Sequence, residues 1–144
     1  MFRIIAIRLF SPCKDYIVRA LHRDTTYFFY NDYEDIGGEY WCGIQKRKKS
    51  ERHFESYYNG FGKNNPEISI SSIVGKNGEG KSSLIEAMIR IINNFTVKAG
   101  FLNDHKTLFM ANGVYGVLFY EVDGDLHSIE CQGEEVKLDE QLVK

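Results

Sequence analysis

The sequence has few of the residues with which small proteins build covalent or metal cross-links. Its three cysteines, Cys13, Cys42 and Cys131, are far apart and odd in number, and no C-x-x-C pair occurs. Neither a disulfide framework nor a zinc site is therefore expected, and reduced thiols in a cytosolic protein are the simplest interpretation. The histidines lack the spacing of metal ligands and are expected to be ordinary polar residues.

Long apolar runs and a large excess of one charge are also absent. No stretch of about 18 apolar residues occurs, and the N-terminus lacks the apolar region of a signal peptide, so we expect a cytoplasmic protein without a membrane partner. The net charge of −2 gives no general argument for binding nucleic acid. What is present is a chain of 144 residues, 43% of them hydrophobic, which predicts a single domain over residues 1–144.

The most informative segment runs from Gly75 to Ser83 and matches the phosphate-binding pattern G-x-x-x-x-G-K-[ST]. Glycines let the backbone adopt positive φ and approach a ligand closely, so that successive amide groups converge on phosphate oxygens. Lys81 would place its charge on the β- and γ-phosphates of a nucleotide, and the Ser82 hydroxyl would bind Mg²⁺. The pattern thus predicts a site for a nucleotide and its metal ion.

The residues on either side of this segment support the prediction. Ile68 to Val74 is short and β-branched, as expected of a buried parallel strand. After the segment, apolar residues recur at steps of three and four, which predicts an amphipathic helix from Ser82 to about Phe95. Glu86 and Arg90 are four residues apart and would form a weak supporting pair on this helix. Strand, glycine-rich loop and helix therefore follow in the order that a phosphate loop requires.

Most of the remaining chain is predicted to be β-structure. Strands are expected over Phe2–Leu9, Tyr16–Leu21, Thr25–Tyr30, Val114–Val122 and Leu126–Cys131. The second and third of these would pair with each other, and Asp123-Gly124 between the last two is a strong hairpin signal. Asp32 to Gly43 is expected to be a loop. We therefore predict an α/β fold in which a mixed sheet packs on one main helix, together with an antiparallel β-layer.

Three further features have a plain structural interpretation beside a functional one. The basic cluster Lys46, Arg47, Lys48, Lys49 and Arg52 could contact phosphate backbones, but a solvated face is the simpler interpretation. Glu121 ends an apolar strand, as a catalytic acid would, yet the strand runs into Asp123-Gly124, so this acid would be a poor partner for Mg²⁺. Asp35-Ile36-Gly37-Gly38 resembles a GTPase D-x-x-G element but precedes the phosphate loop, which is the wrong order.

The phosphate loop Gly75-Lys76-Asn77-Gly78-Glu79-Gly80-Lys81-Ser82-Ser83 resembles that of ABC-type ATPases, G-x-N-G-x-G-K-S-[ST]. The continuation Leu84 to Met88, and the opening strand Ile4 to Leu9, are similar to the SMC, RecF and DNA-repair branch and to related anti-phage defence ATPases. The resemblance implies a P-loop NTPase lobe, like the head of an ABC or SMC protein, that binds ATP and Mg²⁺. The nucleotide-binding residues would be Gly75, Asn77, Gly78, Glu79, Gly80, Lys81, Ser82 and Ser83.

Cys131-Gln132-Gly133-Glu134 is similar to the Q-loop of this branch, in which a glutamine after a strand senses the metal ion and the attacking water. Gln132 is thus a candidate catalytic and metal-contacting residue beside Lys81 and Ser82, and the alternative is a polar residue in a turn. No Walker B strand with a catalytic glutamate and no signature motif follows Lys81. The resemblance therefore implies the N-terminal lobe of a longer ATPase, completed by a C-terminal lobe and able to form a nucleotide-dependent homodimer, with DNA or a nuclease as a possible partner.

Two hypotheses of function follow from the sequence. In the first, the chain binds ATP·Mg²⁺ as part of an ABC/SMC-like ATP hydrolase and hydrolyses it negligibly when alone, since positioning and charge stabilisation are present but the general base is missing. In the second, the chain is an interaction module that contacts nucleic acid or a protein partner without hydrolysis. A small P-loop kinase or GTPase is the weaker third alternative, because no N-K-x-D guanine motif and no arginine-rich lid occur. Tyr16 or Lys14 could lie near an adenine, by analogy alone.

Overall fold

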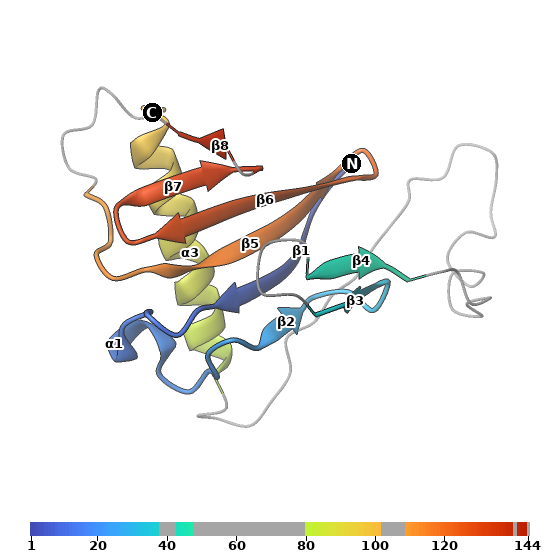
Figure 1. The fold of residues 1–144 in the computed structure, drawn as a ribbon, viewed down its shortest axis with the longest axis horizontal. Coiled ribbons are helices and arrows are strands. Elements are labelled where there is room, and N and C mark those ends of the chain that lie inside the picture. Colours follow the sequence, from blue (N-terminus) through green and yellow to red (C-terminus); the bar gives the residue numbers. More distant parts are fainter. Residues whose placement is uncertain (38–42, 48–79, 102–108, 140, 144) are drawn as a thin grey trace.

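The computed structural model describes residues 1–37, 43–47, 80–101, 109–139 and 141–143, which form a six-stranded antiparallel sheet, a two-stranded hairpin and two helices (Figure 1). In spatial order the large sheet consists of β2 (Thr26–Phe28), β1 (Phe2–Leu9), β5 (Tyr115–Val122), β6 (Asp125–Gln132), β7 (Glu135–Leu138) and β8 (Gln141–Leu142). The long helix α3 (Lys81–Lys98) crosses one face of this sheet, from the β1 side toward β7 and β8. The hairpin of β3 (Tyr33–Asp35) and β4 (Ile44–Lys46) packs on the other face.

The order of apolar residues in β1 explains how it contributes to both faces. Ile4 and Ala6 pair with the adjacent residues Tyr120 and Phe119 of β5, so Ile5 is the extra residue of a β-bulge. The bulge interrupts the alternation of the strand. Ile7 therefore points to the α3 side, whereas Ile5 and Ala6 both pack on the β3–β4 side.

The α3 side of the sheet holds the larger core. Leu84, Ala87 and Ile91 follow one face of the helix and are buried against the sheet, as the helical spacing predicted. Their partners are apolar residues of β1, β5, β6 and β7, including Ile7, Leu118, Ile129, Cys131 and Val136. Burial of these side chains is the main force that fixes α3 on the sheet, since each fully buried aliphatic side chain contributes about 1.5–3 kcal/mol.

Several predicted elements are confirmed. Phe2–Leu9 is a strand, and β5 and β6 form the predicted hairpin, in which Asp123 and Gly124 have φ of 51° and 99°. Positive φ at both central residues is the geometry of a type I′ turn, for which Asp-Gly is a preferred pair. The predicted helix is also present and extends one turn beyond Phe95, to Lys98.

Other predictions are wrong. Tyr16–Leu21 is not a strand but contains the short helix α1 (Asp15–Val18), and β2 pairs with β1 instead. The predicted loop from Asp32 to Gly43 contains β3, and two further strands, β7 and β8, follow Cys131. All strand pairings among the described residues are antiparallel, so the mixed sheet is not seen there. The predicted strand Ile68 to Val74 lies outside the described residues.

Candidate functional site

The last turn of the predicted phosphate loop is formed by Gly80, the residue that precedes α3. Gly80 has φ 96° and ψ 2°, a left-handed conformation that glycine adopts without steric cost. A Cβ atom at this position would lie only 3.1 Å from Leu21 Cδ2. Glycine is therefore favoured here by its backbone conformation, and a larger residue would also have to displace the Leu21 side chain slightly. Gly75 to Glu79, the earlier residues of the predicted loop, lie outside the described residues.

The first residues of α3 are those expected to bind phosphate and metal. Lys81 and Ser82 open the helix, and the Ser82 side chain is exposed whereas Ser83 is buried. The Gly80 carbonyl accepts the amide hydrogen of Leu84 at 2.8 Å, and no side chain caps the N-terminus of α3 among the described residues. Backbone N–H groups of a first helical turn have no acceptor within the helix, and the helix dipole adds positive potential. This end of α3 therefore attracts an anion such as a phosphate group.

The segment from α1 to Leu21 supports this end of the helix. Leu21 and Leu84 belong to the same buried cluster, and Ala20 lies beside Gly80. Two arginines bind the carboxylate of Glu86: Arg19 at 2.7 Å, from the end of α1, and Arg90 at 2.6 Å, from the next turn of α3. The hydrogen bond from Arg90, together with the charge of Arg19, lowers the pKa of Glu86. The predicted pair of Glu86 and Arg90 is thus confirmed and extended by a residue from α1.

Tyr16 and Lys14, the residues considered for adenine, lie on the outer side of α1. The Tyr16 hydroxyl donates a hydrogen bond to the Asn112 carbonyl at 2.6 Å, and the guanidinium of Arg90 lies 5.6 Å from the centre of its ring. Lys14 lies against Gly113, where an added Cβ would meet Lys14 Cγ at 2.3 Å. Both side chains are exposed. These contacts place Tyr16 beside α3 and Lys14 beside Gly113, and they give no evidence for a base-binding pocket.

Gln132 is not brought close to Lys81 and Ser82. It is the last residue of β6, is exposed, and donates a hydrogen bond from Nε2 to Glu130 Oε1 at 2.6 Å. Its neighbour Cys131 points to α3 and contacts the Ile91 carbonyl, so Gln132 points to the opposite face of the sheet. Ile91 is ten residues beyond Lys81, which corresponds to about 15 Å along a helix. The predicted role of Gln132 stays a prediction that this placement does not support.

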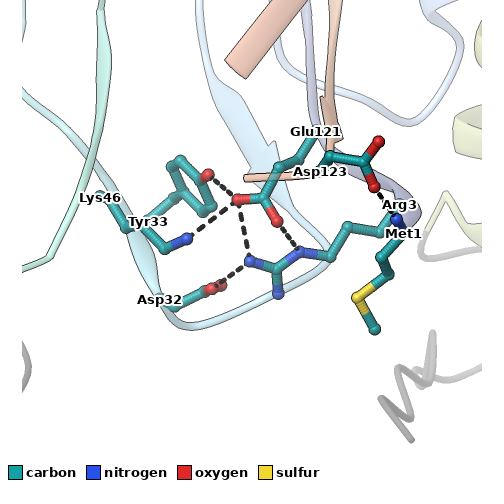
Figure 2. Close-up of polar contacts among 7 residues, drawn as sticks. All are labelled: Met1, Arg3, Asp32, Tyr33, Lys46, Glu121 and Asp123. Atoms are coloured by element: carbon teal, nitrogen blue, oxygen red, sulfur yellow. Dashed lines mark hydrogen bonds and ion pairs between the residues drawn. The ribbon is translucent and has the colours of Figure 1, made fainter. Parts of the chain in front are cut away.

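A separate cluster of polar side chains surrounds Glu121 on the β3–β4 side of the sheet (Figure 2). The Glu121 carboxylate accepts hydrogen bonds from Arg3 Nε at 2.8 Å, from Lys46 Nζ at 3.0 Å and from the Tyr33 hydroxyl. Arg3 also binds Asp32 at 2.6 Å. The hydrogen bond from Arg3 is the largest of the effects that lower the pKa of Glu121 to about 2.

Glu121 is therefore ionised and fully engaged in holding the β3–β4 hairpin on the sheet. The interpretation of its strand as one arm of a hairpin is confirmed. Asp35, the acid of the D-x-x-G-like element, is likewise engaged, because it accepts hydrogen bonds from Thr26 Oγ1 at 2.7 Å and from the Gly37 amide at 2.9 Å. The basic cluster is described only at Lys46 and Arg47, and Lys48, Lys49 and Arg52 lie outside the described residues.

The cysteines and histidines that the structure describes do not form a metal site, and no group of three His, Cys, Asp or Glu side chains is arranged to hold a metal ion in that part of the chain. Burial raises the pKa of the Cys131 thiol to about 12 and also raises that of Cys13. Both thiols are therefore inert toward bases and metals at neutral pH. His127 bonds to Asp139 at 2.7 Å, within the sheet.

The contribution of Arg19 was missed by sequence reasoning. Its segment was predicted to be a strand, and the pairing of Arg19 with Glu86 joins residues 67 positions apart. The only local signal was the apolar pair Ile17-Val18 next to a charged residue, which also fits a strand.

None of the helices in the described ranges is long and apolar enough to cross a membrane. Comparison with models of known protein families, with curated protein sequences and with solved structures found no match.

Proposed function

We propose that this chain binds ATP with Mg²⁺ through Gly75 to Ser83, as the N-terminal part of an ABC/SMC-like ATPase. One observation carries the proposal. Gly80 adopts a left-handed conformation directly before a long helix whose first residues are Lys81 and Ser82. This is the local geometry in which the motif G-x-x-x-x-G-K-[ST] functions, because the backbone turns sharply and the helix N-terminus faces the phosphates.

The residues at this end of α3 fit a nucleotide and its metal ion. Bound Mg²⁺ would neutralise charge on the β- and γ-phosphates. It prefers a few protein oxygens together with phosphate oxygens and water, so an exposed serine hydroxyl at position 82 is a suitable ligand. Lys81 would add its charge to the phosphates, and Gly80 leaves room for the backbone to approach them. Ser83, the residue after the motif, is buried.

We further propose that the chain alone binds ATP without appreciable hydrolysis. Hydrolysis requires a group that orients and deprotonates the attacking water. The two buried glutamates of the described residues do not fit this role: Glu121 is held by Arg3, Lys46 and Tyr33, and Glu130 accepts a hydrogen bond from Gln132. The general base of a full ATPase would then come from another lobe.

The outer face of α3 supports the proposal of such a lobe. Ile85, Ile89 and Ile92 lie opposite the buried face of the helix and are 43%, 57% and 38% exposed. A helix that is apolar on two opposite faces is typical of a helix packed between two layers. The described part of the chain supplies only one of these layers. A C-terminal lobe would supply the second.

The test is titration calorimetry of ATP with Mg²⁺ into the wild type and the Lys81→Ala variant. Lys98→Ala is the matched control, because it removes a lysine from the last turn of the same helix, about 25 Å away. We expect wild type and control to bind alike and Lys81→Ala to bind at least tenfold more weakly, as loss of a charged phosphate contact predicts. Absence of binding by the folded wild type, or equal binding by all three proteins, would contradict the proposal.

A further inference from the structure

Arg19, at the end of α1, has an unusual backbone conformation that several contacts hold in place. Its φ is 49° and its ψ is −111°, a combination that residues with a Cβ atom rarely adopt. Its amide donates to the Asp15 carbonyl at 2.8 Å and its Nε donates to the Tyr16 carbonyl at 3.0 Å. Its guanidinium also pairs with Glu86 of α3 at 2.7 Å. Such conformations persist only where the surroundings determine them, and they concentrate at functional sites.

The contacts of Arg19 fix the next two residues of the chain, which lie against Gly80. Ala20 and Leu21 follow directly, and these are the residues nearest to Gly80: a Cβ there would lie 3.1 Å from Leu21 Cδ2 and 3.6 Å from the Ala20 carbonyl oxygen. Glu86 lies on α3, so the ion pair joins the supporting segment to the same helix that Gly80 begins. The conformation of Gly80 is therefore fixed by α3, which it precedes, and by Ala20 and Leu21, which lie against it.

We propose that Arg19 is a positioning residue for the phosphate loop: through Glu86 it holds Ala20 and Leu21 against Gly80 and so fixes the first turn of α3 for the phosphates of a nucleotide. This inference rests on the proposed function. The ion pair is half exposed on the Arg19 side, so its effect on binding is modest. We expect loss of the pair to weaken binding of ATP·Mg²⁺ about threefold to fivefold.

The Arg19→Gly variant separates positioning from stability. Glycine relieves the strain at φ 49° while it removes the guanidinium, so we expect the Tm to be unchanged or raised although the Kd for ATP·Mg²⁺ rises. If Arg19 affected binding only through the stability of the fold, the Kd for ATP·Mg²⁺ would rise only in variants whose Tm falls. Arg19→Lys keeps the charge and should recover part of the affinity. Arg47→Ala is the control for loss of a half-exposed arginine, since Arg47 pairs with Glu34 at 3.7 Å on the opposite face of the sheet.

A double-mutant cycle with Glu86→Gln tests whether Arg19 acts through this carboxylate. We expect the double variant to bind no more weakly than the weaker of the two single variants, whereas additive losses would overturn the proposed route. Hydrogen exchange gives a readout that does not need ATP: in Arg19→Gly, the Leu84 amide, which donates to the Gly80 carbonyl at 2.8 Å, should exchange faster than in Arg47→Ala. Unchanged exchange would overturn the inference even if no protein binds ATP. Binding by wild type with an unchanged Kd in Arg19→Gly would overturn it and leave the proposed function standing.

Discussion

Asn94 offers the sharpest test of how α3 is joined to the sheet. Its side chain is fully buried. Its amide group binds both backbone groups of Ala111: Nδ2 donates to the Ala111 carbonyl at 2.9 Å, and Oδ1 accepts from the Ala111 amide at 2.7 Å. These two bonds fix the chain that leads into β5 against the C-terminal half of α3. Replacement of Asn94 by alanine leaves both backbone groups of Ala111 without these partners.

The expected effect of Asn94→Ala can be estimated from these contacts. Each hydrogen bond contributes about 0.5–1.5 kcal/mol, and a buried polar group without a partner costs about 1–3 kcal/mol. Because Ala111 is only half buried, water can satisfy part of its bonding. We therefore expect the free energy of unfolding to fall by about 2–4 kcal/mol, a large part of the roughly 5–15 kcal/mol that stabilises a typical domain.

The measurement is equilibrium unfolding in urea, with Asn93→Ala as the neighbouring control. The Asn93 side chain donates an exposed hydrogen bond to the Phe109 carbonyl at 3.0 Å and a long one to Asn94 Oδ1 at 3.4 Å, so its replacement should cost about 1 kcal/mol or less. The slope of the transition should stay the same in both variants, which would show that the surface exposed on unfolding has not changed. Equal losses in the two variants, or a loss below about 0.5 kcal/mol in Asn94→Ala, would refute the reasoning.

Three other predictions concern single sites. Gly80→Ala should lower the free energy of unfolding by more than Gly124→Ala in a urea titration, because both glycines have φ near 100° but only Gly80 has a neighbour close to the added Cβ. Glu121→Gln should reduce stability at neutral pH, measured as Tm. It should also make stability fall less steeply below about pH 4.5. The pKa of Glu121 is lowered to about 2 in the folded protein. The ionised carboxylate therefore stabilises the fold above its unfolded pKa, and this stabilisation is lost as the pH falls toward its folded pKa. Gln132→Ala should leave the Kd for ATP·Mg²⁺ unchanged in calorimetry, because the side chain points to the sheet face opposite α3; a tenfold loss would place it at the nucleotide after all.

The sequence correctly predicted the elements whose residue pattern is formed by near neighbours and extends over the whole element. The Asp123-Gly124 turn, the helical spacing from Leu84 onward and the apolar strand from Phe2 to Leu9 each repeat their signal over a whole element. The segment from Tyr16 to Leu21 was predicted wrongly because Tyr, Ile and Val favour strands. Two contacts override this preference: the packing of the segment against α3, and the ion pair between Arg19 and Glu86. Neither contact can be inferred from the six residues of the segment alone.

The polar cluster around Glu121 shows a second limit of prediction from sequence. The three partners of Glu121 come from β1, β3 and β4, Asp32 joins the cluster through Arg3, and Arg3 is 118 positions from Glu121. No spacing rule connects them, because the sheet brings them together only after β1 has paired with β5. An acid at the end of an apolar strand therefore resembles a catalytic residue until its partners are known.

The position of the candidate site follows from the same topology. α3 is fixed by its buried apolar face and by contacts of its C-terminal half, where Ile91 meets Cys131 and Asn94 binds Ala111. Its N-terminal end lies beyond β1, where the segment after α1 is the neighbouring structure that contacts Gly80. An anion-binding helix end requires first-turn amides that the core leaves accessible, but it also requires a fixed backbone. We expect the proposed site to meet both requirements because Leu21 lies against Gly80 and the Arg19–Glu86 pair joins this segment to α3. The segment after α1 should therefore contribute to nucleotide affinity, although less than Lys81.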